Sequence, residues 1–593
     1  MILLWDFFAS ILVVFPLLTG GIWIKRPGLF IELSELSVPV IIVTLLAVLL
    51  RYGFKADLKQ SYILRATERC WNRWREALET RPARTLLMGW IFFTFLLALS
   101  AIRRHYSFES SSWDLGIYHN AIWNFVHGNG YISAPKEGMN EFIDHQSFSF
   151  LLLAPLVKLF PKPEALLIIQ ACWLSAAGVL AYYLSLQYLP RKHWAVAAFP
   201  LLVWVYNPLR HVNSFDFHPE TMMLSLFLGG IIGVQSPKWR YRALGCFSLL
   251  IALFSRESAG PIAMGIGFAW LLGSSPKRSR TFSQVIAVAL ILVGPVIFYF
   301  DLNFVPKLAG GPYPYHDLYK QFGEGIPSIL LAPIQKPRLF LATIFAKSRF
   351  GFFFWMLAPL GFIPLLNPRT FIATLPPFVI LFLTNGDLRV NLLHHYSIEE
   401  TIGIFWAFPR GVIYFEHYFA NRRKNLGSAR GGDSLSFLSE TPKIWLLFFA
   451  FAAMGRSELF RPRYFTPTAH HLWLKNAFLP AVDPEVTLSV TDNLVPHLTD
   501  RYWARNPMSQ VISSYSIQYP TARQNPLAGQ LVQCVIEDTA LTNYPMNEQM
   551  TEEFHRKLPV LGYLPVYTCG SIHVWSQAQN PTNCLTRTVP CVE

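Results

Sequence analysis

The chain has 593 residues, of which 52% are hydrophobic, 15% aromatic and only 15% charged, and its formal net charge is +14. A soluble protein of this length holds about a quarter charged residues, so the composition excludes an ordinary water-soluble protein and indicates a membrane protein. Lys and Arg fall in short clusters between apolar runs, as in the loops of membrane proteins, so the positive charge gives no reason to infer a nucleic-acid partner.

Apolar runs recur over most of the chain. A helix needs about 20 mostly apolar residues to cross the hydrocarbon layer. By this measure we expect about 13 transmembrane helices, at 1–24, 36–51, 84–102, 163–189, 193–209, 220–235, 241–255, 258–274, 281–300, 350–366, 370–384, 398–415 and 443–455. The first run lacks a basic start and a small-residue cleavage site, so we predict a retained anchor.

These runs divide the chain into four predicted parts. The parts are an N-terminal pair of transmembrane helices at 1–51, a basic cytoplasmic segment at 52–84, a membrane domain at 85–455 and an α/β domain at 456–593. The membrane domain contains a long first outer loop at 103–162. Within it, the apolar run 147–160 is too short to cross and is predicted to lie on the membrane surface. The run 328–346 is similarly ambiguous.

Clusters of Lys and Arg set the predicted orientation. They lie at 51–84, 191–192, 238–242, 277–280 and 422–430. With the helices above, every cluster falls on one side of the membrane, which the positive-inside rule makes cytoplasmic. The N-terminus is therefore predicted to be cytoplasmic, and the acids of the opposite loops and the C-terminal domain to be extracytoplasmic.

The C-terminal region changes from apolar runs to shorter alternating patterns. The stretch 486–501 begins like a strand and continues with a Thr/Asp helix start, and 531–538 resembles a second strand. Together they predict a small α/β domain. Its four cysteines are Cys534, Cys569, Cys584 and Cys591. They form two disulfides in one of three pairings if the compartment is oxidising, or else remain free thiols.

Asp114 opens the first outer loop, within the segment SSWDLGIYHNAIW. A carboxylate among aromatic side chains is partly shielded from water, which makes it a better general base. The alternative is that Asp114 caps the following helix, and the motif alone favours the cap. Asp144 and His145 close the same loop.

Asp216, His218 and Glu220 alternate with apolar residues in the segment SFDFHPE. In an extended segment the three side chains would face the same way and could hold a divalent metal ion. Zinc is less expected, because the cysteines lie elsewhere and no tight histidine spacing is present. The alternative is a turn and cap before a helix that starts near Pro219.

Two further loops add candidates on the same side. Arg256 and Glu257 lie in SRESAG, and His394, His395 and Tyr396 lie in LLHHYS. Arg256 would bind phosphate oxygens in a bidentate manner, or it would simply neutralise Glu257. Because all these loops fall on one face, a single pocket could collect them.

These motifs resemble those of an uncharacterised family of predicted bacterial membrane proteins grouped with the GT-C superfamily of polytopic glycosyltransferases. The matching residues are Asp114-Leu115-Gly116, His145, Phe215 to Glu220, Arg256-Glu257, His395-Tyr396-Ser397 and Asn493 to Leu498. The resemblance covers roughly residues 85–560, with the Phe215–Glu220 string as its most specific piece. The chain departs from the family pattern at His119-Asn120, where the family has an acidic residue followed by Gln, and at Ser258, where the family has an acidic residue.

The resemblance implies an all-α, GT-C-like polytopic bundle with a small extracytoplasmic α/β domain, in the bacterial plasma membrane. It implies transfer of a sugar from a polyprenyl-phosphate donor to an envelope acceptor on the outer face. Asp114 is the expected base, with Glu257 or Asp216 in reserve. Substrate binding is expected from Arg256, Arg210, His145, His218, Glu220, His395 and Tyr396.

No cofactor is required by this interpretation except an optional divalent metal ion, for which Asp216, His218 and Glu220 are the candidate ligands. Two other functions remain open, a lipid-sugar flippase or transporter and a non-catalytic membrane scaffold. A transporter should place ionisable residues near the middle of the membrane, whereas here they cluster at the outer ends of helices, which favours an enzyme.

Overall fold

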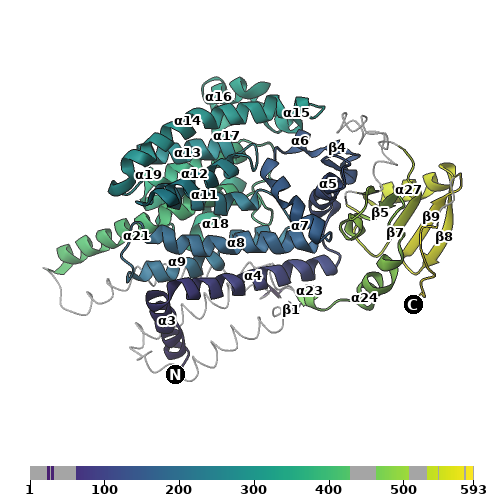
Figure 1. Ribbon diagram of the computed structural model, residues 1–593, viewed down its shortest axis with the longest axis horizontal. Coiled ribbons are helices and arrows are strands. Elements are labelled where there is room, and N and C mark those ends of the chain that lie inside the picture. The colour runs from purple at the N-terminus through teal and green to yellow at the C-terminus, as the bar shows by residue number, and fades with distance from the viewer. Residues whose placement is uncertain are drawn as a thin grey trace.

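The computed structural model describes residues 23–26, 29–32, 62–427, 462–506, 530–544, 546–579 and 583–591. It shows a helical bundle with a sheet domain at one end (Figure 1). The predicted helices at 36–51 and 443–455 lie outside the described residues. Of the predicted helix 1–24, only Trp23 and Ile24 are described, in strand β1 (Trp23–Arg26), which pairs with β2 (Leu29–Glu32) in an antiparallel hairpin.

Three helices in the described part of the chain are long and apolar enough to cross a membrane. They are α4 (Pro82–Tyr106), α8 (Glu164–Ser185) and a helix over Lys277–Leu308 that contains α14 (Arg280–Asn303) and α15 (Val305–Leu308). The bent pair formed by α17 (Pro337–Ile344) and the segment Lys347–Leu360, which begins with α18 (Lys347–Leu357), would make a fourth. The predicted number of about 13 is therefore not confirmed.

The difference arises because several expected crossings form shorter helices. These are α9 (Trp194–Trp204), α11 (Thr221–Val234), α12 (Trp239–Leu253) and α13 (Ala259–Leu271). A helix of 14 residues, such as α11, measures about 21 Å, whereas the hydrocarbon layer is about 30 Å thick. Two of these helices begin where polar site segments end, α11 directly after Glu220 and α13 directly after Ser258.

The bundle packs through close helix pairs. The pairs α11–α12 and α13–α14 make the most extensive contacts, and α8 packs against α4, α9 and α11. A Cβ atom added at Gly233 would lie 2.6 Å from the Cα atom of Gly245, so only glycine permits this approach of α11 to α12. The other helices are α3 (Tyr62–Thr80), α10 (Asn207–Ser214), α16 (Gly325–Gln335), α19 (Pro368–Phe371), α20 (Leu375–Phe382) and α21 (Ile398–Gly427).

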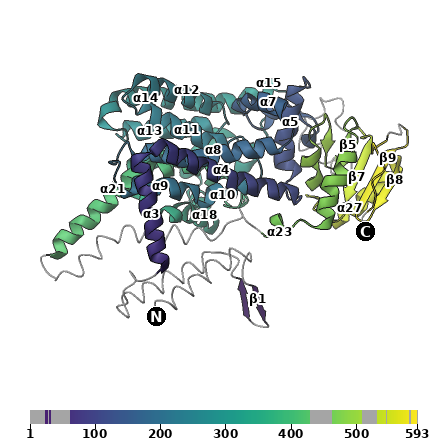
Figure 2. The same ribbon diagram turned by 60° about the horizontal axis from the view of Figure 1, so that its bottom comes forward.

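The loops that connect the helices gather in two groups, one at each end of the bundle. Tyr188, after α8, donates a hydrogen bond to the Gln235 side chain at 2.8 Å and lies 3.0 Å from the Ser274 carbonyl oxygen. These contacts gather three of the predicted cytoplasmic loops at one end. The loops with the acids and histidines meet at the other end, beside the sheet domain (Figure 2). Which end faces the cytoplasm stays a prediction.

The first outer loop folds into short elements. They are the one-turn π-helix η2 (Ser112–Gly116), α5 (Ile117–Val126), the hairpin β3 (Ile132–Ser133) and β4 (Met139–Asn140), α6 (Glu141–Asp144), η4 (Phe148–Leu153) and α7 (Ala154–Leu159). The last two occupy the run 147–160 and expose Leu152, Leu159 and Phe160. Such a face suits the predicted position on a membrane surface. The run 328–346 forms α16 and α17, which expose Leu330 and Ile334.

The C-terminal domain contains a five-stranded mixed sheet. Its strand order is β6-β5-β7-β9-β8, and β5 pairs in parallel with β6 and β7 while the other pairs are antiparallel. The strands are β5 (Leu488–Val490), β6 (Ala504–Arg505), β7 (Cys534–Asp538), β8 (Tyr563–Cys569) and β9 (Ile572–Gln577), and the helices are α23 (Pro462–Phe465), α24 (Ala469–Trp473) and α27 (Glu548–Val560). The two predicted strands are β5 and β7, so this part of the prediction is confirmed.

Two disulfides join distant parts of this domain. They connect Cys534 to Cys584 and Cys569 to Cys591. The sequence left open whether these cysteines pair, and the structure pairs all four. The remaining cysteines, Cys70, Cys172 and Cys246, are free.

Candidate active site

Asp114 lies in the one-turn helix η2, just beyond the end of α4. The Ser111 hydroxyl accepts a hydrogen bond from the Trp113 backbone N–H at 3.1 Å, so Ser111 and not Asp114 caps this turn. Oδ1 of Asp114 lies 3.1 Å from Nε2 of His218, and 20% of the Asp114 side chain remains exposed. Asp114 is therefore held by a histidine while staying accessible to a ligand.

His218 and His395 stack on one another beside Asp114. Their ring centroids are 3.6 Å apart, and Nε2 of His395 lies 3.3 Å from Oε1 of Glu220. Burial lowers the pKa of His218, but the hydrogen bond to Asp114 and the charge of Glu220 outweigh it and raise the pKa. Burial, together with the charges of His218 and Arg256, holds the pKa of His395 well below its usual value. The surroundings of the stacked pair therefore favour protonation of His218 over protonation of His395.

Arg256 lies between two carboxylates, those of Glu220 and Glu257. It forms an ion pair with Glu220, and its Nε lies 3.7 Å from Oε1 of Glu257. Glu257 is also bound by Nδ1 of His145 and by the Tyr313 hydroxyl, each at 2.9 Å. Burial would raise the pKa of Glu257, but His145 and Arg256 hold it at about 2. Oε1 of Glu257 thus receives all these contacts, whereas its Oε2 is buried without a hydrogen-bond partner. Arg256 is neutralised within the site.

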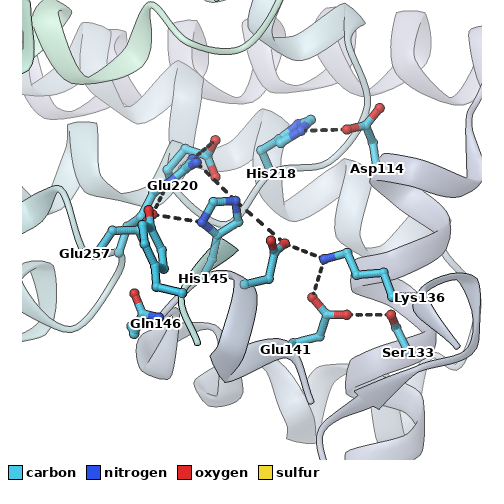
Figure 3. Close-up of polar contacts among 12 residues, drawn as sticks. Asp114, Ser133, Lys136, Glu141, His145, Gln146, His218, Glu220 and Glu257 are labelled. Atoms are coloured by element: carbon cyan, nitrogen blue, oxygen red, sulfur yellow. Dashed lines mark hydrogen bonds and ion pairs between the residues drawn. The ribbon is translucent and has the colours of Figure 1, made fainter. Parts of the chain in front are cut away.

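A second buried ion-pair group continues this network around Lys136, a cation that no sequence motif pointed to. Lys136 Nζ lies 2.7 Å from Oε2 of Glu141 and also forms an ion pair with Asp144 (Figure 3). Burial would raise the pKa of Asp144, but Lys136 and His145 hold it below its usual value. The group connects to the rest because Oδ2 of Asp144 lies 3.8 Å from Nε2 of His145. The loop 134–145 therefore helps to hold His145 in place through Asp144.

Asp216 points away from His218 and Glu220. Its backbone is left-handed, with φ of 91°, which breaks the alternation expected of an extended segment. The carboxylate pairs with Arg104 and accepts hydrogen bonds from the Ser110 hydroxyl at 2.8 Å and the Ser111 N–H at 3.0 Å. The three predicted metal ligands Asp216, His218 and Glu220 therefore do not converge on one point.

Arg210 is bonded within its own helix. It lies on α10, where its Nη2 donates to Oδ1 of Asn207 at 3.1 Å. The two departures from the family pattern are also placed by the structure. His119 and Asn120 contact the C-terminal domain through Thr499, and Ser258 donates to Oε1 of Glu399 at 2.6 Å.

A different set of three residues fits a metal ion. Among the described residues, Asp114, His218 and His395 each offer a ligand atom, and these atoms lie within 4.8 Å of one another. Nδ1 of His218 and Nδ1 of His395 are buried without a hydrogen-bond partner. Two imidazole nitrogens and one carboxylate oxygen are a donor set that suits zinc or another divalent transition metal. This set shares only His218 with the predicted one.

A cavity of about 250 Å³ begins at the ion-pair network. His145, Glu220, Arg256 and Glu257 line its polar end, and its remaining walls include Tyr313, Tyr315, Tyr319, Tyr396, Phe298, Leu302, Ile329, Leu330 and Ile380. His395 also lines the cavity. Asp114 does not line it, but contacts His218, which stacks on His395. A space with one charged end and apolar walls fits an amphiphilic ligand.

Arg389 is the cation of this cavity that sequence reasoning missed. Its guanidinium lies over the rings of Tyr315 and Tyr396, 5.4 and 5.5 Å from their centroids. In the described part of the chain no carboxylate forms an ion pair with Arg389, in contrast to Arg256. Its only sequence signal is its place five residues before His394, in a loop already singled out for its histidines.

Comparison with known proteins finds similarity at the level of a family. No curated protein matches the chain significantly in sequence. Among solved structures, ArnT from Cupriavidus metallidurans bound to undecaprenyl phosphate aligns at 12% identity, over 84% of this chain and 98% of that chain, with a TM-score of 0.45. The Archaeoglobus fulgidus oligosaccharyltransferase in its apo form aligns at 13% identity, over 86% and 76%, with a TM-score of 0.39.

With TM-scores below 0.5, these alignments establish neither a common fold nor a shared activity. The family comparison is more direct, because the model of the family described as "Predicted membrane protein (DUF2079)" matches residues 104–552. That range contains the whole site and most of the C-terminal domain. The chain belongs to this family of predicted membrane proteins.

Proposed function

We propose that this chain is a membrane glycosyltransferase, which transfers a sugar from a polyprenyl-phosphate donor to an envelope acceptor on the extracytoplasmic face. One arrangement carries the proposal. Asp114 is a partly exposed carboxylate, linked through the stacked His218 and His395 to a cavity with charged side chains of both signs at one end and apolar walls beyond. The proposed reaction needs a base for the acceptor hydroxyl and a cavity that binds an amphiphilic donor.

The donor side of the site is the cavity. A polyprenyl phosphate combines an anionic head with a long apolar chain, which matches the polar end and the apolar walls around Ile329 and Leu330. Arg389 is a better phosphate ligand than Arg256, because Arg256 is already neutralised by Glu220 and Glu257. A guanidinium binds phosphate oxygens in a bidentate manner.

Asp114 is the best candidate for the base. An acceptor hydroxyl attacks the anomeric carbon, the bond from that carbon to the phosphate oxygen breaks, and the phosphate leaves with the electron pair. The hydroxyl proton passes to Asp114. A phosphate leaves without being protonated, so one base and positive charge are sufficient. Glu257 is less suitable, because it is buried and its Oε1 already accepts hydrogen bonds from His145 and Tyr313. Asp216 is less suitable, because its carboxylate is held by Arg104, Ser110 and Ser111.

A divalent metal ion fits the same site. If it is held by Asp114, His218 and His395, it would supply positive charge for the departing phosphate. A metal ion binds the neutral form of imidazole, so metal binding would displace any proton from the ligand nitrogens of His218 and His395. Arg389 and the apolar walls of the cavity keep their roles with or without the ion.

The disulfides support the predicted sidedness. Disulfides persist in oxidising compartments and are rare in the cytosol. The domain that contains Cys534–Cys584 and Cys569–Cys591 packs directly against the loop that carries Asp114. An extracytoplasmic C-terminal domain therefore favours an extracytoplasmic site.

Purified protein in liposomes with labelled polyprenyl-phosphate sugar tests the proposal. We expect the label to move to an added envelope acceptor, with release of polyprenyl phosphate. Movement of the intact donor between leaflets without transfer would instead identify a flippase. If neither transfer nor movement occurs with any acceptor fraction, the proposal is wrong and a scaffold function takes its place.

A further inference from the structure

The short segment Ser110–Ser112, which leads into Asp114, is held from two sides. On the bundle side, Asp216 accepts hydrogen bonds from the Ser110 hydroxyl at 2.8 Å and the Ser111 N–H at 3.0 Å. On the side of the C-terminal domain, Oδ1 of Asp492 accepts from the Ser112 N–H at 3.2 Å and from the Ser112 hydroxyl. The Asn493 side chain donates to the Ser110 carbonyl oxygen at 2.9 Å.

These contacts are shielded from water. Ser110 and Ser112 are fully buried, and Asp492 and Asn493 are 1% and 7% exposed. A buried polar group that loses its partner is left unsatisfied, so each of these bonds constrains the segment strongly. Ser112 is also the first residue of the π-helical turn that contains Asp114. The hydrogen bonds that hold Ser112 therefore also set the direction of the Asp114 side chain.

The C-terminal domain also holds the helix that follows Asp114. Nδ1 of His119 lies 2.8 Å from the Thr499 hydroxyl, and the Asn120 side chain donates to the Arg501 carbonyl oxygen at 2.8 Å. Both residues belong to α5, which continues directly from η2. The domain therefore contacts the chain both before Asp114, at Ser110 and Ser112, and after it, in α5.

We infer that the C-terminal domain is a positioning part of the active site, and that Asp492 and Asn493 set the orientation of the Asp114 turn. Asp216 holds the same segment from the bundle side, through Ser110 and Ser111. We call these contacts of Asp216, Asp492 and Asn493 with residues 110–112 the clamp. The catalytic consequence rests on the proposed function, whereas the clamp itself does not. Asp492 and Asn493 are positioning residues, because both act on Asp114 only through the backbone of the serine segment.

Hydrogen exchange of the full-length protein measures the clamp directly. In Asp492→Ala we expect the amides of residues 110–116 to exchange roughly 10-fold faster, because two buried donors of Ser112 lose their acceptor. Asp492→Asn should restore slow exchange, since its amide oxygen can accept both hydrogen bonds. Asp500→Ala is the matched control, because Asp500 joins the same domain to Lys162 but does not contact the serine segment.

Transfer activity gives the second readout. We expect Asp492→Ala to lower kcat roughly 10-fold or more while KM for the donor changes little, because the cavity is intact. Asp492→Asn and Asp500→Ala should keep kcat near that of the unchanged protein. If Asp492→Ala fails to fold, Asn493→Ala removes only the bond to Ser110 and is read in the same way.

Two results would overturn the inference. The first is unchanged exchange over residues 110–116 in folded Asp492→Ala and Asn493→Ala. The second is faster exchange with full kcat in an active enzyme. If the unchanged protein transfers no sugar while Asp492→Ala still loosens residues 110–116, the proposed function fails and the clamp is supported.

Discussion

His218 Nε2 lies 3.1 Å from Asp114 Oδ1, although 104 residues separate the two along the chain. Asp114 comes from the loop after α4 and His218 from the loop before α11, and His395 from a third loop stacks on His218. The ring of His218 thus joins the exposed carboxylate to the cavity-lining histidine. This contact turns three separate loops into one site.

Asp114→Asn should abolish sugar transfer and leave the fold intact. The amide keeps the shape and can still contact His218, but it cannot accept the acceptor's proton, so we expect a loss of roughly 100-fold or more. The measurement is transfer in liposomes, together with the melting temperature in detergent. Asp317→Asn is the control, since Asp317 pairs with Lys320 on the surface. Full activity in Asp114→Asn would eliminate Asp114 as the base.

Arg389→Gln should weaken binding of the phosphate donor. The substitution removes the one cavity-lining cation that no described carboxylate neutralises, so KM for the donor should rise roughly 10-fold, while the melting temperature stays the same. Binding of polyprenyl phosphate, measured directly, should weaken in parallel. Arg338→Gln provides the comparison, because Arg338 is exposed on α17. Equal donor affinity in both variants would remove Arg389 from the phosphate site.

The stability of the C-terminal domain should fall as the pH rises from about 4 to 7. Burial raises the pKa of Asp492 to about 7, the charge of Asp114 raises it further, and hydrogen bonds from Ser112 and Ser111 oppose the shift. In the unfolded chain the pKa of an Asp is about 3.9. A carboxyl group whose pKa is raised by folding stabilises the fold below its unfolded pKa and loses that effect as pH rises through the folded pKa.

The three-unit shift corresponds to at most roughly 4 kcal/mol of unfolding free energy over this range. Asp492→Asn removes the ionisation, so its unfolding free energy should depend less on pH between 4 and 7. Melting temperatures of the two proteins across that range give the comparison. Parallel pH profiles would show that Asp492 ionises in the folded protein as it does in the unfolded chain.

Loss of the Cys534–Cys584 disulfide should destabilise the C-terminal domain. The bond closes a loop with a sequence separation of 50, and removing a native disulfide from a small domain costs about 2–5 kcal/mol. We expect a lower unfolding temperature in the Cys534→Ala, Cys584→Ala double variant, whereas Cys70→Ala should have no effect because Cys70 is exposed and free. Alkylation of the denatured, unreduced protein should label three thiols; labelling of seven would contradict the pairing.

The sequence by itself determined the class of the protein and predicted many of the residues that gather around Asp114. Low charge and recurring apolar runs indicated a membrane protein, and alternation predicted the strands β5 and β7. Segregated charge predicted that His145, His218, Glu220, Arg256, Glu257, His395 and Tyr396 would lie at one end with Asp114, and the structure brings them together there. These features are local, since composition, periodicity and loop charge are each read within one stretch of chain.

Only the tertiary structure decided which of these residues pair. Asp216 turns to Arg104 because its backbone is left-handed, and Asp492 reaches Ser112 from 380 residues away. The predicted number of about 13 transmembrane helices is not confirmed, because helices such as α11 and α13 are shorter than a membrane crossing requires. Long-range partners depend on how loops are directed by packing around them, and a one-dimensional pattern contains no information about that direction.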